Sequence, residues 1–207
     1  MLTRLSTLIL QTLTTTRTFE EITIVIAWAL TIVVGLILLP NANEAAGGGL
    51  AVLMIAIAVV DARRFIIPDE LTAGALVLGF LNAAMQDSEM VVEALAFAAL
   101  RGVVLTFAFF CMRVLYRRVR GRDGIGLGDV KLASVAGVWL DWSMVPIVIE
   151  IAALAALTIY ATRHFFRGKT IRSTTVLPFG LFFAPAIWLG WLLQSTFYLI
   201  PPTPSFQ

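Results

Sequence analysis

The 207-residue chain is 59% hydrophobic and only 14% charged, whereas soluble domains average about 45–50% apolar and about 25% charged residues. This composition excludes an ordinary soluble domain and indicates an integral membrane protein. The net charge of +2 gives no sign of nucleic-acid binding. One cysteine and one histidine exclude a disulfide framework and argue against a zinc site built from Cys and His ligands.

The apolar stretches predict the architecture. A helix needs roughly 20 apolar residues to cross the hydrocarbon core of a bilayer, and six or seven such stretches follow one another with short loops between them. We therefore predict an all-α, polytopic integral membrane protein with about seven transmembrane helices. The second span is short unless it begins near residue 45. The expected spans are 22–39, 50–60, 66–85, 91–112, 130–140, 144–160 and 177–193.

These spans divide the chain into three expected parts. Residues 1–21 are polar and hydroxyl-rich and form a cytoplasmic or interfacial leader. Residues 22–200 form a single transmembrane domain, and residues 201–207 form a short tail.

The distribution of positive charge predicts the orientation. Eleven of the 15 Lys and Arg residues lie in the loops at 63–64, 113–122 and 163–172, whereas the loops at 41–49, 86–90 and 141–143 contain none. Because cytoplasmic loops carry the excess of Lys and Arg, the basic loops are expected in the cytoplasm. With seven spans, the N-terminus then lies inside and the C-terminus outside.

Two aspartates stand where basic loops meet apolar runs on this cytoplasmic side. Asp61 opens the sequence Asp61-Ala62-Arg63-Arg64, and Asp129 closes Gly126-Leu127-Gly128-Asp129. An ionisable residue at such a boundary is a functional hypothesis. Two carboxylates held close together share a proton, so that one takes a proton from water while the other protonates a carbonyl oxygen. That is the chemistry of aspartyl proteases, and it requires no metal or cofactor.

Each acid also has a purely structural interpretation. A lone aspartate at the end of a span is usually a solvated helix cap, and what favours catalysis is the presence of both acids on one face. Gly126 and Gly128 admit the close approach of a helix or an extended substrate, but a glycine turn after a basic loop explains them equally well. Lys131 is expected at the membrane interface, or tunes Asp129.

The segment after Asp61 contains two further candidates. Pro68 suits the first turn of a helix, because its missing N–H is not needed there. Asp69 suits the positive end of the same helix. Asp69 and Asp123 have polar, loop-like neighbours, so we expect both to be solvated rather than catalytic.

These residues carry a family resemblance. Asp61, the run 67–71 (Ile-Pro-Asp-Glu-Leu) and the run 126–132 (Gly-Leu-Gly-Asp-Val-Lys-Leu) resemble the type IV prepilin peptidase family of Gly-x-Gly-Asp membrane aspartyl proteases. A weaker family motif is similar to Pro178-Phe179-Gly180. The resemblance extends over residues 45 to 193, approximately.

The resemblance implies a multi-pass endopeptidase of the inner (plasma) membrane that faces the cytoplasm. It would remove the short basic leader from prepilins or pseudopilins, with Asp61 and Asp129 as the catalytic pair. The implied partners are this substrate and membrane lipid, without nucleic acid, and the oligomeric state stays open. Supporting or substrate-binding roles are expected for Pro68, Asp69, Gly126, Gly128, Lys131, Pro178 and Gly180.

One departure from the family concerns cysteine. Larger bacterial members carry two Cys-x-x-Cys pairs in a cytoplasmic region associated with N-methylation, whereas this chain has a single cysteine. It therefore resembles the short form found with tight-adherence (Flp-type) pilus systems, or an archaeal counterpart. N-methylation is not expected.

Two other functions compete with proteolysis. A small proton-coupled transporter would use the same acids as a relay, although the sequence shows no inverted repeat of the kind common in transporters. An inactive scaffold of a secretion or pilus assembly is the third possibility.

Two structural expectations concern the membrane interior and the outer interface. Arg101 near mid-span is expected to pair with Glu150, unless it snorkels or faces water. Trp139 and Trp142 are expected in an aromatic band at the outer interface.

Overall fold

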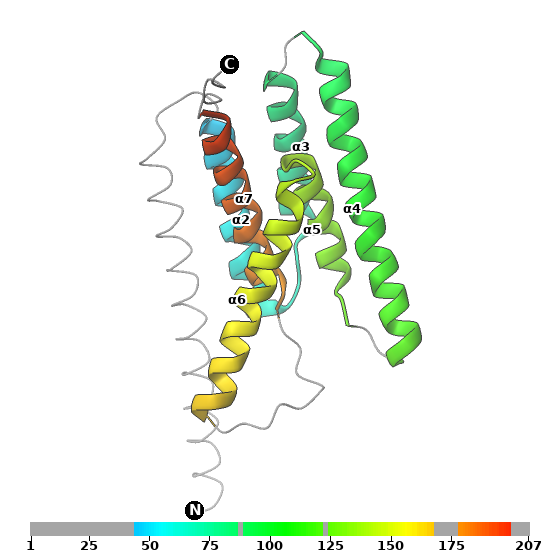
Figure 1. Ribbon diagram of the computed structural model, residues 1–207, viewed down its shortest axis with the longest axis vertical. Helices are drawn as coiled ribbons and strands as arrows, with labels where there is room; N and C mark the ends of the chain where they lie inside the picture. The colour runs from blue at the N-terminus through cyan, green and yellow to red at the C-terminus, as the bar shows by residue number, and fades with distance from the viewer. Residues whose placement is uncertain (1–43, 87–88, 122–123, 168–177, 200–207) are drawn as a thin grey trace, which may run out of the picture.

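The computed structural model describes residues 44–86, 89–121, 124–167 and 178–199 (Figure 1). The expected leader, the expected first span at 22–39 and the short tail lie outside these residues, as do Asp123 and the last part of the third basic loop. All of the regular secondary structure in the described residues is α-helical. The helices are α2 (Glu44–Arg64), α3 (Asp69–Gln86), α4 (Val91–Arg120), α5 (Leu127–Trp139), α6 (Met144–Arg167) and α7 (Gly180–Leu199).

The helices alternate in direction, so one end of the bundle gathers the ends of α2, α4 and α6 and the beginnings of α3, α5 and α7 (Figure 1). Both candidate aspartates lie at this end. The segments Ala45–Arg64 in α2, Val91–Arg120 in α4 and Met144–Thr162 in α6 are long and apolar enough to cross a membrane. The protein is therefore an integral membrane protein.

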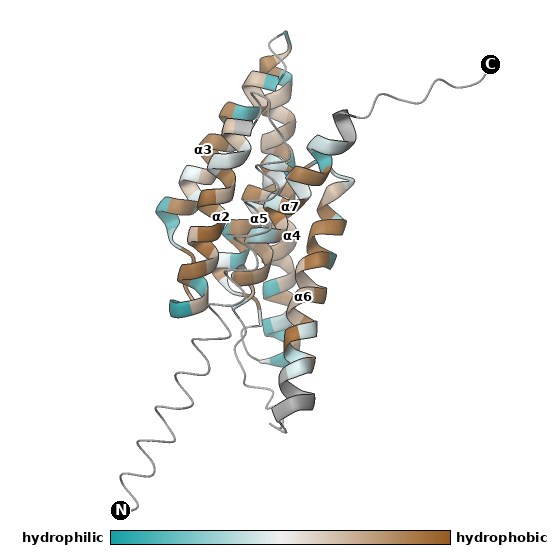
Figure 2. Cartoon of the chain, turned by 90° about the vertical axis from the view of Figure 1, so that its left-hand side faces the viewer, coloured by the Kyte–Doolittle hydropathy of each residue, from teal (hydrophilic) through white to brown (hydrophobic). Residues whose placement is uncertain are grey.

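The outer surface of α4 is suited to lipid. Figure 2 shows hydrophobic residues along the middle of the long helices, and large apolar side chains of α4 are exposed. In a membrane these side chains meet acyl chains rather than water. They include Phe97, Leu100, Val103, Val104, Phe107 and Phe110.

The centre of the bundle is formed by α5 and α7. The indole of Trp188 in α7 is 1% exposed, and its Nε1 donates a hydrogen bond of 3.1 Å to the carbonyl oxygen of Gly47 in α2. A Cβ added at Gly47 would lie 1.8 Å from the ring of Trp191, so only glycine permits this crossing. In α5, a Cβ at Gly137 would lie 2.5 Å from the carbonyl oxygen of Arg101, which brings α4 and α5 together.

The structure corrects several expected boundaries. The arginines expected in the loop 113–122 lie, up to Arg120, in the last turns of α4, and the loop expected from residue 163 is helical to Arg167. The third helix begins at Asp69, so Pro68 precedes it instead of lying in its first turn. In each case the end of the helix is set by where its backbone hydrogen bonds end. Hydropathy does not report on these bonds. The second helix does begin near residue 45, as its length required.

Arg101 does not pair with Glu150. Its Nη1 lies 3.7 Å from Oδ1 of Asp141, and its Nε donates a hydrogen bond of 3.1 Å to the carbonyl oxygen of Gly137. The prediction was wrong because α4, which carries Arg101, packs on α3 and α5, whereas α6, which carries the exposed Glu150, packs on α7.

Trp139 is not an interface residue either. It is 3% exposed, and its Nε1 donates a buried hydrogen bond of 2.9 Å to the carbonyl oxygen of Ala75 in α3. Trp142 is 48% exposed, so that part of the expected aromatic band stays a prediction.

Candidate active site

The connection between α2 and α3 forms one edge of the site. Phe65 has a φ of 56°, in the left-handed region that ends a helix, and its N–H donates a hydrogen bond of 2.9 Å to the carbonyl oxygen of Asp61. Ile66, Ile67 and Pro68 then leave the helical conformation until α3 begins. This turn leaves Asp61 in the last turn of α2, beside the non-helical segment 66–68.

The backbone at the start of α7 holds Asp61. Only 5% of Asp61 is exposed, and its Oδ2 accepts a hydrogen bond of 3.0 Å from the N–H of Leu181. A Cβ added at Gly180 would lie 2.8 Å from this oxygen. Glycine at position 180 therefore lets the carboxylate reach the positive end of the α7 dipole.

The start of α5 holds Asp129 in the same way. The Oδ2 atom of Asp129 accepts a hydrogen bond of 3.1 Å from the N–H of Gly126, three residues earlier. Asp129 lies just before the apolar part of α5, outside the three segments that can cross a membrane. The pKa of Asp129 is raised from 3.8 to about 6, first by burial and then by the negative charge of Asp61, while the Gly126 N–H and the Arg113 guanidinium act in the opposite direction.

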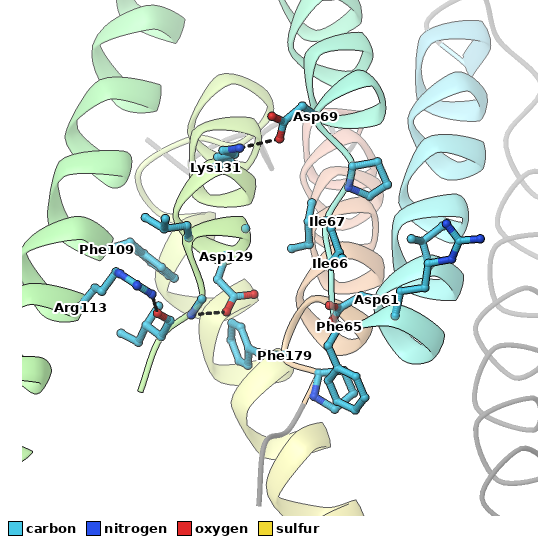
Figure 3. Close-up of a pocket in the computed structure, with 18 of the residues that line it drawn as sticks. Asp61, Phe65, Ile66, Ile67, Asp69, Phe109, Arg113, Asp129, Lys131 and Phe179 are labelled. Carbon is cyan, nitrogen blue, oxygen red and sulfur yellow. Dashed lines mark hydrogen bonds and ion pairs between the residues drawn. The ribbon is translucent and has the colours of Figure 1, made fainter. Parts of the chain in front are cut away.

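Both aspartates line one cavity of about 1410 Å³ (Figure 3). Its walls are largely apolar and come from α2 to α6, from the segments between α2 and α3 and between α4 and α5, and from the segment before α7. On one side the rings of Phe109 and Phe183 stack at 5.6 Å between centroids, and Phe179 stacks on Phe183 at 5.3 Å. Two electrostatically coupled carboxylates in a partly apolar cavity are suited to share one proton and to act as an acid and a base.

The structure places the remaining predicted site residues around this cavity. Gly128 lies against Ile67, because an added Cβ would lie 2.9 Å from the Ile67 Cβ. Pro68 and Pro178 line the cavity and are half-buried. Gly126 and Gly180 touch the two carboxylates directly, as described above.

Lys131 turns away from Asp129. Its Nζ lies 2.5 Å from Oδ1 of Asp69, and the two side chains are 49% and 70% exposed, respectively. Lys131 thus joins the start of α3 to α5 at the edge of the cavity. Asp69 is exposed, as expected, but it is an ion-pair partner rather than a freely solvated acid.

Three residues of the site were not predicted from the sequence. Arg113 in α4 donates a hydrogen bond to the carbonyl oxygen of Ile125 and is the cation that acts on Asp129. Ile67 is 7% exposed and packs between Gly128 and Gly180. Phe179 belongs to the wall near Asp129 (Figure 3). The closeness of Arg113 and Asp129 in the sequence could have indicated that the two side chains interact, but Arg113 was expected in a loop.

A comparison with protein families identifies the family of the chain. The model of the type IV leader peptidase family matches residues 49–161, a region that contains both aspartates and the Gly-x-Gly-Asp segment. The chain belongs to the type IV leader peptidase family. The resemblance inferred from the two aspartate motifs is thereby confirmed.

Curated relatives agree with this family. The chain is 33% identical over 164 residues to a prepilin leader peptidase/N-methyltransferase of Burkholderia pseudomallei (strain 1026b). The matched region covers 78% of this chain and 50% of the relative. Proteins of the same name from Dichelobacter nodosus and Pseudomonas aeruginosa are 33% and 29% identical over 139 residues, covering 67% of this chain and 45% and 46% of the relatives. The chain spans about half the length of the curated relatives it matches. No solved structure matches it.

Proposed function

We propose that this chain is a membrane-embedded aspartyl endopeptidase that cleaves the basic leader peptide from type IV prepilins or pseudopilins. The observation that carries the proposal is the pair formed by Asp61 and Asp129, two carboxylates on one cavity whose charges interact. Each is anchored by a backbone N–H at the start of a helix. Membership of the type IV leader peptidase family and the names of the relatives support the same reaction.

The reaction follows from the shared proton. The ionised aspartate takes a proton from water as the water oxygen attacks the scissile carbonyl carbon, and the neutral aspartate gives its proton to the carbonyl oxygen. In the second step the newly protonated acid gives its proton to the leaving nitrogen. The other acid recovers a proton from the tetrahedral intermediate as the C–N bond breaks. Both acids thus return to their starting states.

The shape of the cavity supports an extended peptide as substrate. The non-helical segment 66–68 and the starts of α5 and α7 leave space at both carboxylates. Apolar walls from Phe109, Ile149 and Phe179 suit the hydrophobic helix that follows a prepilin leader. Of the two activities in the relatives' names, we propose only the peptidase, because the methyltransferase region of the family is cysteine-rich and this chain has one cysteine.

We further propose that the chain has seven transmembrane helices in the inner (plasma) membrane and that the cavity faces the cytoplasm. The basic residues at the ends of α2 and α4 support this orientation, because they lie at the same end of the bundle as the cavity. Residues 22–39 would supply the additional span, and residues 22–200 a single peptidase domain.

The test is co-expression of the chain with a prepilin, followed by a gel shift and N-terminal sequencing of the product. Asp61→Asn and Asp129→Asn each keep the size and polarity of the side chain but remove the titratable proton. We expect wild type to cleave and both variants to be inserted but inactive, with Glu93→Gln as a matched control on the exposed start of α4. Cleavage by either Asn variant would exclude that residue from catalysis. No cleavage by wild type would favour the transporter or the scaffold.

A further inference from the structure

Arg113 is connected to Asp129 through a single peptide group. Its Nη1 donates a hydrogen bond to the carbonyl oxygen of Ile125, and that carbonyl shares a peptide group with the N–H of Gly126. The same N–H donates a hydrogen bond of 3.1 Å to Oδ2 of Asp129. Figure 3 shows both bonds, with Arg113 and Asp129 on the same side of the cavity.

This arrangement strengthens the hydrogen bond to Asp129. In a trans peptide the C=O and the N–H point in opposite directions, so a cation on the oxygen side draws electron density away from the N–H. Hydrogen bonds arranged in a chain polarise one another in this way. A stronger donor favours the ionised form of the carboxylate that accepts from it.

The charges around Asp129 single out Arg113. On α4 the cation that acts on Asp129 is Arg113. Its guanidinium lowers the pKa of Asp129, whereas burial and the negative charge of Asp61 raise it. Lys131, on the same helix as Asp129, pairs with Asp69. The parts of α6 and of the segment before α7 that line the cavity are apolar. The other titratable or charged groups that line it are Asp61 and Arg64 of α2, Asp69 and Glu70 of α3, and Tyr116 of α4.

We propose that Arg113 is a positioning residue that acts through the Ile125–Gly126 peptide group to strengthen the hydrogen bond that holds the carboxyl group of Asp129. The inference rests on the proposed peptidase function and adds to it a residue that tunes one acid of the pair.

The test is the pH dependence of kcat/KM for cleavage of a synthetic peptide with a basic leader and an apolar continuation, in detergent micelles. Arg113→Gln should raise the alkaline limb of the profile, where Asp129 loses its proton beside the charged Asp61, by about one pH unit, because an opposite charge within a few ångströms lowers a carboxyl pKa by 1–3 units. Arg113→Lys keeps the charge but not the planar fork, so it should shift the limb in the same direction by less. The matched control is Arg118→Gln, which removes an exposed charge of the same helix that does not line the cavity.

Two results would overturn the proposal. One is an Arg113→Gln enzyme that loses rate equally at every pH, as a merely structural residue would. The other is an Arg118→Gln enzyme whose limb moves as far as that of Arg113→Gln. If Arg113→Gln is not recovered in the membrane, an unshifted limb in Arg113→Lys decides against the proposal.

A second measurement separates this inference from the proposed function. The infrared C=O band of the protonated Asp129 carboxyl is the band that Asp129→Asn removes, and its titration needs no substrate. The midpoint of this titration should rise by about one pH unit in Arg113→Gln. An unchanged midpoint would refute the role of Arg113. Absence of cleavage by wild type would instead refute the peptidase.

Discussion

The backbone N–H of Leu181 donates a hydrogen bond of 3.0 Å to Oδ2 of Asp61, and the two residues lie 120 positions apart in the sequence. Asp129 is held at 3.1 Å by the N–H of Gly126. Each acid of the pair is therefore fixed by the N-terminal backbone of a different helix, α7 for Asp61 and α5 for Asp129. The geometry of the pair depends on how these two helices pack, and small residues at their starts control it.

Gly180→Ala should reduce kcat while the protein still folds. The new Cβ would lie 2.8 Å from Oδ2 of Asp61 and 2.9 Å from Cδ1 of Ile67, so the carboxylate must move away from the Leu181 N–H. A hydrogen bond to a charged group contributes about 1.5–3 kcal/mol, and we expect kcat to fall about 10- to 100-fold. The measurement is steady-state cleavage of a prepilin peptide.

The control for this substitution is Gly74→Ala in α3, where the added Cβ would lie 3.8 Å from Leu53, an ordinary contact. Alanine stabilises a helix by up to about 1 kcal/mol relative to glycine, so this variant should keep wild-type kcat. Equal rates for Gly180→Ala and wild type would show that the Leu181 bond does not position Asp61 for the reaction.

Arg101→Leu should destabilise the bundle. The substitution leaves the carbonyl of Gly137 without its 3.1 Å donor and removes the contact of 3.7 Å with Asp141. An unsatisfied buried group costs about 1–3 kcal/mol, which thermal unfolding in detergent would report as a lower Tm. Glu150→Leu, on the exposed side of α6, should leave the Tm unchanged. Non-additive effects of the two substitutions would restore the pairing of Arg101 with Glu150.

The exposed ion pair of Lys131 and Asp69 should contribute little to stability. The two side chains are 49% and 70% exposed, and exposed ion pairs are worth about 0.2–1 kcal/mol. A double-mutant cycle with Lys131→Gln and Asp69→Asn, followed by thermal unfolding, should give a coupling below about 1 kcal/mol. A larger coupling would mean that this pair, rather than helix packing, holds the start of α3 against α5.

The raised pKa of Asp129 predicts a pH-dependent stability. Because burial raises this pKa from 3.8 to about 6, the folded chain binds more protons than the unfolded chain between these values. Stability therefore falls as pH rises through this window. Asp129→Asn should raise the Tm relative to wild type near pH 8, corresponding to about 1–3 kcal/mol, and have little effect near pH 4. A Tm difference independent of pH would contradict the raised pKa.

Much of the fold was predictable because hydropathy reports directly on membrane spans. The apolar runs gave the positions of α2 to α7, and the positive charges placed both aspartates at one end of the bundle. The exact helix ends were not predictable in the same way. The last two turns of α4 contain Arg117, Arg118 and Arg120, and backbone hydrogen bonds continue through them although the hydropathy falls.

The predictable part of the site was its titratable residues. Asp61, Asp129 and their glycines stand out because acids and Gly-x-Gly are rare beside apolar runs. The partners of charged groups were not predictable, because they depend on which helices are neighbours. Depth in the membrane suggested Glu150 for Arg101, yet α4 packs on α5 and α3 while α6 packs on α7, and the partner of Arg101 is Asp141. Likewise Arg113, not Lys131, acts on Asp129.

The most direct test of the paired-aspartate mechanism compares initial cleavage rates of the purified Asp61→Asn, Asp129→Asn and doubly substituted enzymes. Groups that act as one unit lose the same activity singly and together. We predict that each single variant falls about 10²- to 10⁴-fold below wild type and that the double variant is no slower than the slower single one. A double variant whose loss is the product of the two single losses, or a single variant with the wild-type rate, would contradict the mechanism.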